Sequence, residues 1–258
     1  MNYIGIDIGS TCAKTVVLNE KKELILEFVQ PTGWSSVDTA KEIRQKLEFA
    51  GINLSNESSH CVATGYGRIS VPYADKTVTE ITCHALGAVH LFQHPDLTVI
   101  DIGGQDTKII QIEQGFVKDF IMNDKCAAGT GRFLEVMANT LSLRPNEMFD
   151  LARLGSDTTI SSMCTVFAES EVIGLIGKGE PKENIAYAVV NSTIRKVAAQ
   201  VSRMNGEMFT FCLTGGLCEC DYIREALSKE LGKDVFSCPD ARYAGAIGAA
   251  LSAMKVRR

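Results

Sequence analysis

IDIG at residues 6–9 recurs as IDIG at residues 100–103, which places Asp7 and Asp101 at equivalent positions 94 residues apart. Each copy ends a short apolar run at its aspartate and then enters a glycine-containing turn. A second apolar run follows, so each copy predicts two strands joined by a tight turn. One strand–turn–strand unit with a carboxylate at its first strand end can arise by chance. Two units with the carboxylate at the same position are much less probable by chance, so they indicate a repeat.

The match between the two copies continues beyond the turn at the same offset. Lys14 corresponds to Lys108, and the apolar run 16–18 corresponds to residues 110–112. The period is that of a domain rather than of a short solenoid repeat. The sequence therefore predicts two similar α/β halves, at residues 1–95 and 96–258, with the last helix able to pack back on the first half.

Around this repeat, hydrophobic periodicity alternates between strand and helix. We expect strands near residues 3–8, 14–18, 24–29, 60–64, 97–101, 108–112, 116–122, 209–213 and 235–236. We expect helices near residues 37–50, 81–92, 130–141, 146–154, 164–177, 181–204 and 217–231, and from 244 onward.

Composition limits the classes of partner. The chain has 258 residues, 45% of them apolar and 22% charged, with a net charge of −5. An acidic chain without a basic stripe argues against nucleic acid as the main partner. We expect no membrane span, because no apolar run reaches about 18 residues, and no signal peptide ahead of the first strand. Nine cysteines are then better interpreted as reduced thiols or metal ligands in a cytoplasmic protein.

The first turn has the chemistry of a phosphate site. Glycine, hydroxyl groups and free N–H groups in a tight turn can surround a phosphate, while a strand-end carboxylate such as Asp7 can hold Mg²⁺ through water. The phosphate contacts that we expect in this turn are Ser10, Thr11, Cys12, Ala13 and Lys14. Lys14 has an alternative interpretation as a surface lysine on a strand.

Two cysteines stand near predicted helix starts. NDKCAAGTGRF at residues 123–133 contains Cys126, and SSMCTVFAESE at residues 161–171 contains Cys164. A helix N-terminus has partial positive charge and free N–H groups, which favour a thiolate or a bound anion. Each cysteine alone could be a small buried apolar residue, but the shared setting favours a common role.

The order of motifs resembles the ATPase fold of actin, Hsp70 and sugar kinases. The motifs are DIGST at residues 7–11, DIGGQD at 101–106, TGG at 214–216 and GAIGA at 245–249. The resemblance implies two actin-like, ribonuclease H-like domains with a nucleotide cleft between them. It also implies that Gly103 and Gly104 approach the phosphates and that Gly215 and Gly216 bind the adenosine side.

Longer motifs narrow the resemblance to the activator components of 2-hydroxyacyl-CoA dehydratases. These motifs are ATGYGR at residues 63–68, the Cys126 segment and CTVFAESEV at residues 164–172. The family implies that Cys126 and Cys164 hold half of one [4Fe-4S] cluster at a homodimer interface. A cubane needs four thiolates, and a two-fold axis would supply the other pair.

The same resemblance implies that ATP hydrolysis drives a low-potential electron into a separate dehydratase or a related iron–sulfur reductase. A ferredoxin or flavodoxin is the implied electron donor. Cys218 and Cys220 depart from the family pattern. We interpret them as small residues without a ligand role, with a second metal site as the alternative.

We assign the hydrolytic chemistry to two residues of the second turn. Asp101 would position Mg²⁺ and water, and Gln105 would orient the attacking water. The alternative for Asp101 is an ordinary strand-end cap, and Gln105 has a similar structural alternative.

Other residues are assigned by position. Gly129, Thr130 and Gly131 would couple nucleotide and cluster, because they follow Cys126 closely. Glu169 would reach the ribose or else lie on a solvated helix face, and Arg242 would stack on adenine or else be exposed. We assign no ligand role to the four histidines, His60, His84, His90 and His94.

Two other functions use the same fold. A small-molecule kinase would use Asp101 as a base for a substrate hydroxyl, and an actin-like scaffold would hydrolyse ATP to control assembly. Neither accounts for the matched cysteines, and the chain is short for the insertions that build a sugar site.

Overall fold

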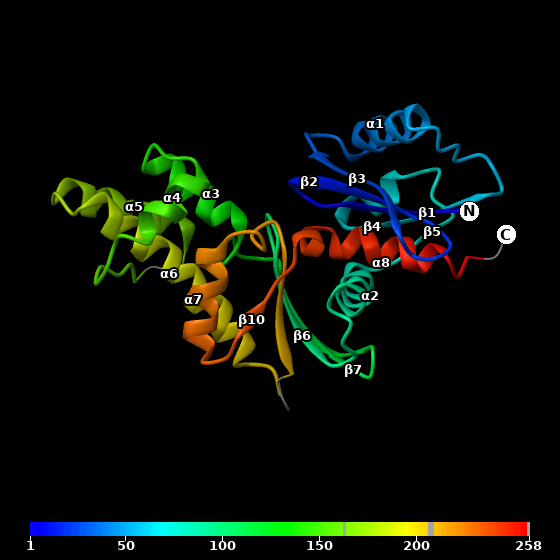
Figure 1. The fold of residues 1–258 in the computed structure, drawn as a ribbon. Helices are drawn as coiled ribbons and strands as arrows, with labels where there is room; N and C mark the ends of the chain where they lie inside the picture. The colour runs from blue at the N-terminus through cyan, green and yellow to red at the C-terminus, as the bar shows by residue number, and fades with distance from the viewer. Residues whose placement is uncertain (162–163, 206–208, 257–258) are drawn as a thin grey trace. The chain divides into compact units, whose positions relative to one another are not determined.

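The structure is a computed structural model that describes residues 1–161, 164–205 and 209–256. It divides into two compact units (Figure 1). The first consists of residues 1–97, 110–118 and 240–258, and the second of residues 98–109 and 119–239. Within the described ranges, no helix is both long and apolar enough to span a membrane.

The first unit contains a mixed sheet with the strand order β3-β2-β1-β4-β5. Its strands are β1 (Asn2–Ile8), β2 (Cys12–Leu18), β3 (Leu24–Pro31), β4 (Ser59–Thr64) and β5 (Lys76–Thr77). The central strand β1 pairs antiparallel with β2 and parallel with β4. In this register Asp7 lies opposite Lys14 on one side and opposite Thr64 on the other.

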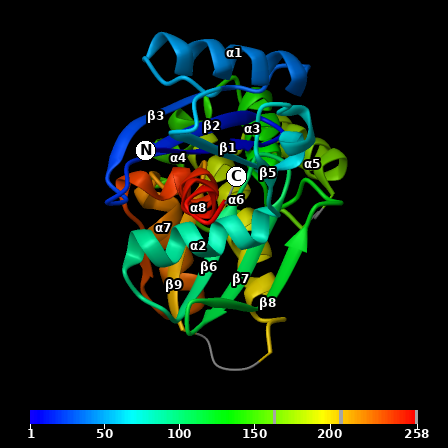
Figure 2. The same ribbon diagram turned by 90° about the vertical axis from the view of Figure 1, so that its right-hand side faces the viewer.

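Helices cover both faces of this sheet (Figures 1 and 2). Helix α1 (Ser36–Phe49) begins where the Ser35 side chain accepts a hydrogen bond from the Asp38 N–H, and it buries Ile43 and Leu47. Those residues pack with Ile6 in one cluster on one face. The helices of the other face are α2 (Glu80–Phe92) and α8 (Ala244–Ala253).

Helix α8 packs closely on its neighbours through glycines. A Cβ on Gly5 of β1 would collide with the Ala246 carbonyl, and a Cβ on Gly248 would collide with the Cys83 carbonyl of α2. Helix α8 is buried along almost its whole length. These contacts place the C-terminal helix against the sheet formed by the N-terminal residues.

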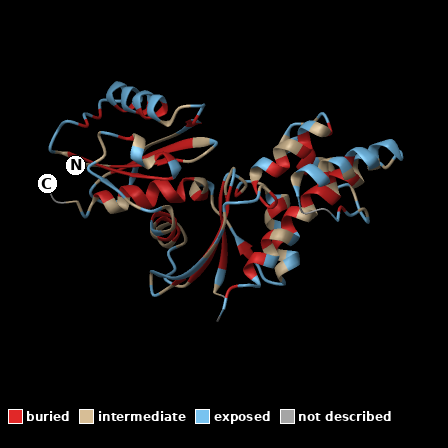
Figure 3. Ribbon diagram, turned by 180° about the vertical axis from the view of Figure 1, so that it is seen from behind, coloured by how far each residue is buried: buried red, intermediate tan, exposed pale blue. Residues whose placement is uncertain are grey.

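The second sheet has the order β10-β9-β6-β7-β8, with the wholly buried strand β6 in the middle. Its strands are β6 (Leu97–Ile102), β7 (Thr107–Glu113), β8 (Phe116–Asn123), β9 (Thr210–Gly215) and β10 (Val235–Phe236). The helices of the second unit are α3 (Gly131–Thr140), α4 (Pro145–Ala152), α5 (Thr165–Gly177), α6 (Lys182–Val201) and α7 (Asp221–Leu231). Helix α5 buries Ala168 and Val172 and is otherwise largely exposed (Figure 3).

The predicted α/β class and the predicted strands and helices are confirmed. The periodicity missed the short elements: β5 and the 3-10 turns at Tyr66–Ser70 and Pro239–Tyr243. Helix α6 ends at Val201, before the predicted end at residue 204, and helix α7 begins at Asp221, after the predicted start at residue 217. One-turn elements contain too few residues to show a period, so hydrophobic patterning cannot detect them.

The glycine contacts of α8 predict a stability difference. Gly248→Ala should lower the free energy of unfolding by about 1–3 kcal/mol, because the new methyl group must displace the Cys83 backbone. Urea unfolding followed by circular dichroism measures this change. Gly174→Ala is the matched helical control, because a Cβ there meets nothing within 4 Å. The control should keep or raise stability by up to about 1 kcal/mol, and equal stabilities of the two variants would contradict the packing argument.

Candidate functional site

The two aspartate turns are closed by the same backbone hydrogen bond. The Gly9 N–H donates to the Cys12 carbonyl at 3.1 Å, and the Gly103 N–H donates to the Asp106 carbonyl at 2.9 Å. The sequence repeat therefore extends to the geometry of the turn. Both turns leave an aspartate at the end of a buried strand.

A left-handed glycine covers each of these aspartates. Gly65 follows β4 and Gly215 ends β9, and both have φ of 85°. A Cβ on Gly215 would lie 2.5 Å from the Ile102 carbonyl oxygen and 2.9 Å from Asp101 Oδ1. A Cβ on Gly65 would collide with the Ile8 carbonyl and lie 2.6 Å from Asp7 Oδ1. Only a residue without a side chain satisfies both this φ and this approach.

Asp101 is held by two partners from neighbouring strands. Its Oδ1 accepts a hydrogen bond of 2.8 Å from the Thr214 hydroxyl, and its Oδ2 lies 3.4 Å from Lys108 Nζ. Lys108 Nζ also lies 2.8 Å from Asp106 Oδ2, and the three charged side chains are almost wholly buried. A buried cation with two buried carboxylates gives a fixed, pre-oriented anionic site.

We predicted no role for the side chains of Lys108 and Asp106 from the sequence. The signal was available for Lys108, since it corresponds to Lys14 in the repeat. Thr214 could also have been found, because an apolar strand ending in Thr-Gly occurs at residues 64–65 and again at 214–215.

Asp7 has a different neighbour. The His84 Nε2 atom lies 4.0 Å from Asp7 Oδ2, and both side chains are buried. A Cβ on Gly245 would lie 2.5 Å from Asp7 Oδ2 and 2.9 Å from His84 Nε2. The start of α8 therefore leaves room for the carboxylate and imidazole to approach. We expected no ligand role for His84, whereas the fold places it beside the first carboxylate.

The predicted phosphate contacts lie on the first turn and its flanks. Thr11 is exposed, Ser10 and Cys12 are half-buried, and Ala13 and Lys14 are buried on β2. Thr32 fixes this turn, because its hydroxyl donates to the Gly9 carbonyl at 2.8 Å.

The second turn is joined to the start of α3. The Gly131 N–H donates to the Gly103 carbonyl at 2.9 Å, and the Arg132 N–H donates to the Gly104 carbonyl at 2.8 Å. Gln105 is exposed at the tip of the same turn. The structure thus brings the predicted residues Gly103, Gly104 and Gly131 together.

Cys126 is exposed on a loop with defined hydrogen bonds. The Asn123 Nδ2 atom donates to the Cys126 carbonyl at 2.8 Å and to the Ala128 carbonyl at 3.1 Å. The Thr107 hydroxyl of β7 donates to the Gly129 carbonyl at 2.6 Å. The backbone around the cysteine is therefore positioned by β7 and by the end of β8.

Cys164 is also exposed, but its setting differs. It is the N-cap residue of α5, whereas the N-cap of α3 is Thr130, beyond Cys126 in the chain. Both cysteines therefore lie near helix starts as predicted, with Cys126 upstream of α3 and Cys164 at the N-cap of α5. Residues 162 and 163, within the motif that we quoted for Cys164, lie outside the described residues.

The thiols of Cys126 and Cys164 differ from those of the buried cysteines in their exposure to solvent. Burial raises the pKa of the Cys83 thiol to about 12 and that of the Cys212 thiol to about 12. Such thiols stay protonated at neutral pH and are poor ligands. Cys126 and Cys164 are the two cysteines in the exposed class among the described residues.

Glu169 and Arg242 have partners within their own units. The Thr140 hydroxyl donates to Glu169 Oε1 at 3.1 Å, which links α3 to α5. Burial, together with the charge of Asp240, raises the pKa of the Glu27 carboxyl, and the nearby Arg242 offsets part of that rise. The contacts with ribose and adenine that we expected for Glu169 and Arg242 stay predictions.

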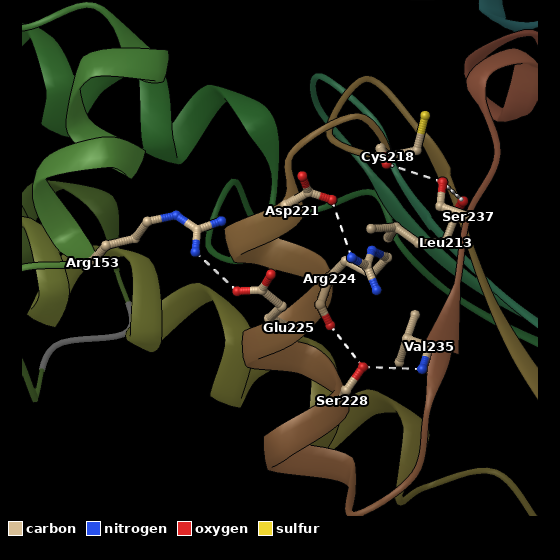
Figure 4. Close-up of polar contacts among 9 residues, drawn as sticks. All are labelled: Arg153, Leu213, Cys218, Asp221, Arg224, Glu225, Ser228, Val235 and Ser237. Carbon is tan, nitrogen blue, oxygen red and sulfur yellow. Dashed lines mark hydrogen bonds and ion pairs between the residues drawn. The ribbon is translucent and has the colours of Figure 1, made fainter.

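A polar cavity of about 420 Å³ lies beside the second glycine of the TGG motif. Its lining includes Gly216, Asp150 and Tyr222. Arg153, also in the lining, places its guanidinium 5.3 Å from the centre of the Tyr222 ring and pairs with Glu225 at 2.9 Å (Figure 4). The cavity thus joins a flat stacked surface to several hydrogen-bonding groups.

Cys218 and Cys220 lie next to this cavity in structural positions. The Ser237 hydroxyl is 3.0 Å from the Cys218 carbonyl and 3.2 Å from the Leu213 carbonyl (Figure 4). Cys218 is buried, and Cys220 is the N-cap residue of α7. In the described part of the chain, no group of three or more His, Cys, Asp or Glu side chains is placed to hold a metal ion.

Comparison with known proteins matches this geometry to a family. The sequence pattern of the BadF/BadG/BcrA/BcrD ATPase family matches residues 4–253. The (R)-2-hydroxyglutaryl-CoA dehydratase activating ATPase of Acidaminococcus fermentans is 43% identical over 98% of this chain and 96% of its own length. The chain belongs to the BadF/BadG/BcrA/BcrD ATPase family.

Other members and solved structures agree with this assignment. The activator of lactoyl-CoA dehydratase from Anaerotignum propionicum is 40% identical over 98% of this chain and 97% of its own length. The crystal structure of the A. fermentans (R)-2-hydroxyglutaryl-CoA dehydratase component A has a TM-score of 0.91 at 41% identity, covering 99% of this chain and 98% of that one. The activator of 2-hydroxyisocaproyl-CoA dehydratase from Clostridium difficile, solved with bound ADPNP, has a TM-score of 0.88 at 33% identity, covering 100% and 99%.

The predicted resemblance, the fold class and the class of ATPase are thereby confirmed. A ROK-family glucokinase from Streptomyces griseus shares the fold alone, with a TM-score of 0.61 at 15% identity. The kinase alternative therefore has no support beyond the common architecture of this ATPase superfamily.

The glycine that covers Asp101 predicts a specific loss of ATPase activity. Gly215→Ala should reduce ATP hydrolysis at least about tenfold, because the methyl group strains a left-handed backbone by about 1–3 kcal/mol and displaces the carboxylate. Gly232→Ala is the control, since Gly232 also has a positive φ, of 64°, but a Cβ there meets nothing within 4 Å. Steady-state phosphate release measures both, and equal losses in the two variants would refute the covering role.

Proposed function

We propose that this ATPase activates a 2-hydroxyacyl-CoA dehydratase, or a related iron–sulfur reductase, by delivering a low-potential electron to it. The observation that carries the proposal is the direct hydrogen bonding between the Gly103–Gly104 turn and the segment that follows the exposed Cys126. Relatives named as activators or activating ATPases of 2-hydroxyglutaryl-, lactoyl- and 2-hydroxyisocaproyl-CoA dehydratases support it.

The proposed nucleotide residues lie on the two aspartate turns and beside the TGG motif. Asp7 holds Mg²⁺ through water, and residues 10–14 contact the terminal phosphates. Asp101 positions metal and water, and Gln105 at the exposed turn orients the water. The cavity beside Gly216 suits the adenosine side, because a stacked Arg153–Tyr222 pair offers a flat surface and the polar rim offers hydrogen bonds.

The residues present fit a [4Fe-4S] cluster shared by two copies of the chain. Cys126 and Cys164 are exposed thiols of the second unit, and they supply two of the four ligands that a cubane needs. A second copy related by a two-fold axis would supply the other two. When bound, the cluster supplies a one-electron carrier.

The surface around Cys164 supports the homodimer. Helix α5 follows Cys164 directly, and it exposes Val166 and Phe167, each 67% exposed, together with Ile173 and Ile176. An apolar helix face of this kind marks an interaction surface. A second copy would cover it where the cysteine ligands meet.

Hydrogen bonds offer a path from nucleotide to cysteine. A change at the Gly103–Gly104 turn is passed to Gly131 and Arg132 by backbone bonds, and Thr107 ties β7 to Gly129. Helix α3 then reaches α5 through Thr140 and Glu169. The segments that contain Cys126, before α3, and Cys164, before α5, would therefore move together when nucleotide binds.

The remaining assignments follow from the family. A ferredoxin or flavodoxin donates the electron, and the reducing cytoplasm suits nine free cysteines. Residues 1–95 and 96–258 represent the two copies of the repeat.

Asp101→Asn should slow ATP turnover by about 100-fold or more while the fold is retained. The amide still accepts the Thr214 hydrogen bond, but it has no charge to offer the metal or Lys108. Phosphate release under saturating ATP measures the effect. Asp119→Asn, on the exposed strand β8, is the control and should hydrolyse ATP at the unmodified rate. Near-normal turnover in Asp101→Asn would remove this residue from the mechanism.

Cys126→Ser and Cys164→Ser should each abolish bound iron and sulfide after anaerobic reconstitution. A serine hydroxyl stays protonated at neutral pH and is a poor ligand for a soft iron–sulfur core. By symmetry, one substitution removes two of the four ligands. Dimerisation should weaken as well, because a shared cluster ties the two chains together.

The matched controls for the cysteine variants are serine substitutions at Cys12, Cys61, Cys83, Cys212 and Cys238. Each should keep its iron, and ATP binding should survive in the two ligand variants. A full iron content in Cys126→Ser or Cys164→Ser, measured per dimer, would disprove the shared cluster.

A further inference from the structure

A second cavity lies in the same unit, between the two cysteine-bearing segments. Its volume is about 200 Å³, and its wall includes Ala128 and Gly129, which follow Cys126, and Ile160 and Ser161, which precede Cys164. Phe133 of α3 and residues of α6 form the rest of the wall. None of the ATPase or cysteine-ligand roles above uses this cavity.

The wall from α6 carries positive charge without a protein counter-charge. Arg195 and Lys196 both line the cavity, and neither forms an ion pair within the described residues. The Lys196 stem packs on the backbone beside the cavity, since a Cβ on Gly129 would lie 2.9 Å from Lys196 Cγ. An anion bound in the cavity would be attracted by both charges.

The lining contains hydroxyl groups but no carboxylate among the described residues. Ser161 and Ser192 contribute the hydroxyls. The nearby Glu171 is already engaged, because its two carboxylate oxygens accept from the Ser161 N–H at 3.0 and 3.1 Å. The Ser161 hydroxyl also donates to Glu171, and the Ser192 hydroxyl donates to the Val189 carbonyl at 2.7 Å. The charges of Arg195 and Lys196 are therefore the groups of the lining that an anion in the cavity would meet.

The inner wall is apolar. Phe133, Ile160 and Ala128 line it, and all three are buried. A volume of about 200 Å³ corresponds to roughly six or seven water molecules at about 30 Å³ each. This is too small for a nucleotide but suits a small organic anion whose body rests on apolar side chains.

We infer that this cavity binds a small carboxylate that carries a short alkyl chain. The planar guanidinium of Arg195 matches a carboxylate in a bidentate pair, with Lys196 as a second charge. The alkyl chain would lie against Phe133 and Ile160. Inorganic phosphate has no apolar part to occupy this wall.

The occupant would touch both segments that lead to the cysteines. If the proposed cluster is present, the bound carboxylate should slow the removal of iron by a chelator, because it immobilises both loops. This consequence rests on the proposed function, whereas the binding itself does not.

Calorimetric titration of the anaerobically purified protein tests the site with butyrate, butyramide and inorganic phosphate. Butyrate should bind at least about tenfold more tightly than butyramide, which has the same shape without the charge. Arg195→Gln and Lys196→Met should each weaken butyrate at least about tenfold, and methionine preserves the apolar stem over Gly129. Lys182→Gln is the control, since Lys182 is exposed on the same helix outside the cavity, and it should bind butyrate normally.

Equal binding of butyrate and butyramide would overturn the inference, as would unweakened binding in both charge variants. Binding of phosphate without butyrate would overturn the assignment to alkyl carboxylates. If the purified protein contains no iron, the proposed cluster is refuted. The butyrate titration of that protein would still show whether the cavity binds an alkyl carboxylate.

Discussion

The two carboxylates at the strand ends depend on a steric constraint that only glycine satisfies. Gly65 and Gly215 have the same φ of 85°, and each brings bare backbone against the oxygen of an aspartate. Gly65 directly follows β4, which lies next to β1 with Asp7, and Gly215 ends β9, which lies next to β6 with Asp101. A side chain at either glycine would push the carboxylate out of its place. The close approach of neighbouring strands and the position of the carboxylate therefore depend on the same glycine.

The two strand-end aspartates, each covered by a glycine, differ in the charged groups around them. In the second unit, Lys108 lies between Asp101 and Asp106, so positive charge balances a buried pair of carboxylates. In the first unit, Cys12 occupies the place of Asp106, and His84 approaches the carboxylate from a helix. The duplicated fold thus holds its two strand-end carboxylates in different electrostatic settings.

The second unit joins its turn to its cysteine loop by local backbone bonds. Gly131 lies five residues beyond Cys126 and bonds to Gly103. Backbone hydrogen bonds transmit displacement without long flexible side chains. Because the same region borders the cation-lined cavity at Gly129, three features of the unit share one short segment.

By itself the sequence determined the strand–turn–strand repeat, most helix and strand positions and the motifs around Cys126 and Cys164. These are local patterns, which residues close together in the sequence show without knowledge of the structure. Only the tertiary structure brought Gly215 over Asp101, His84 beside Asp7 and Glu169 to Thr140. Those residues are far apart in the chain, and no periodicity encodes which distant side chains meet. Sheet order and helix packing decide such contacts, because they are set by burial of the whole core rather than by any single segment.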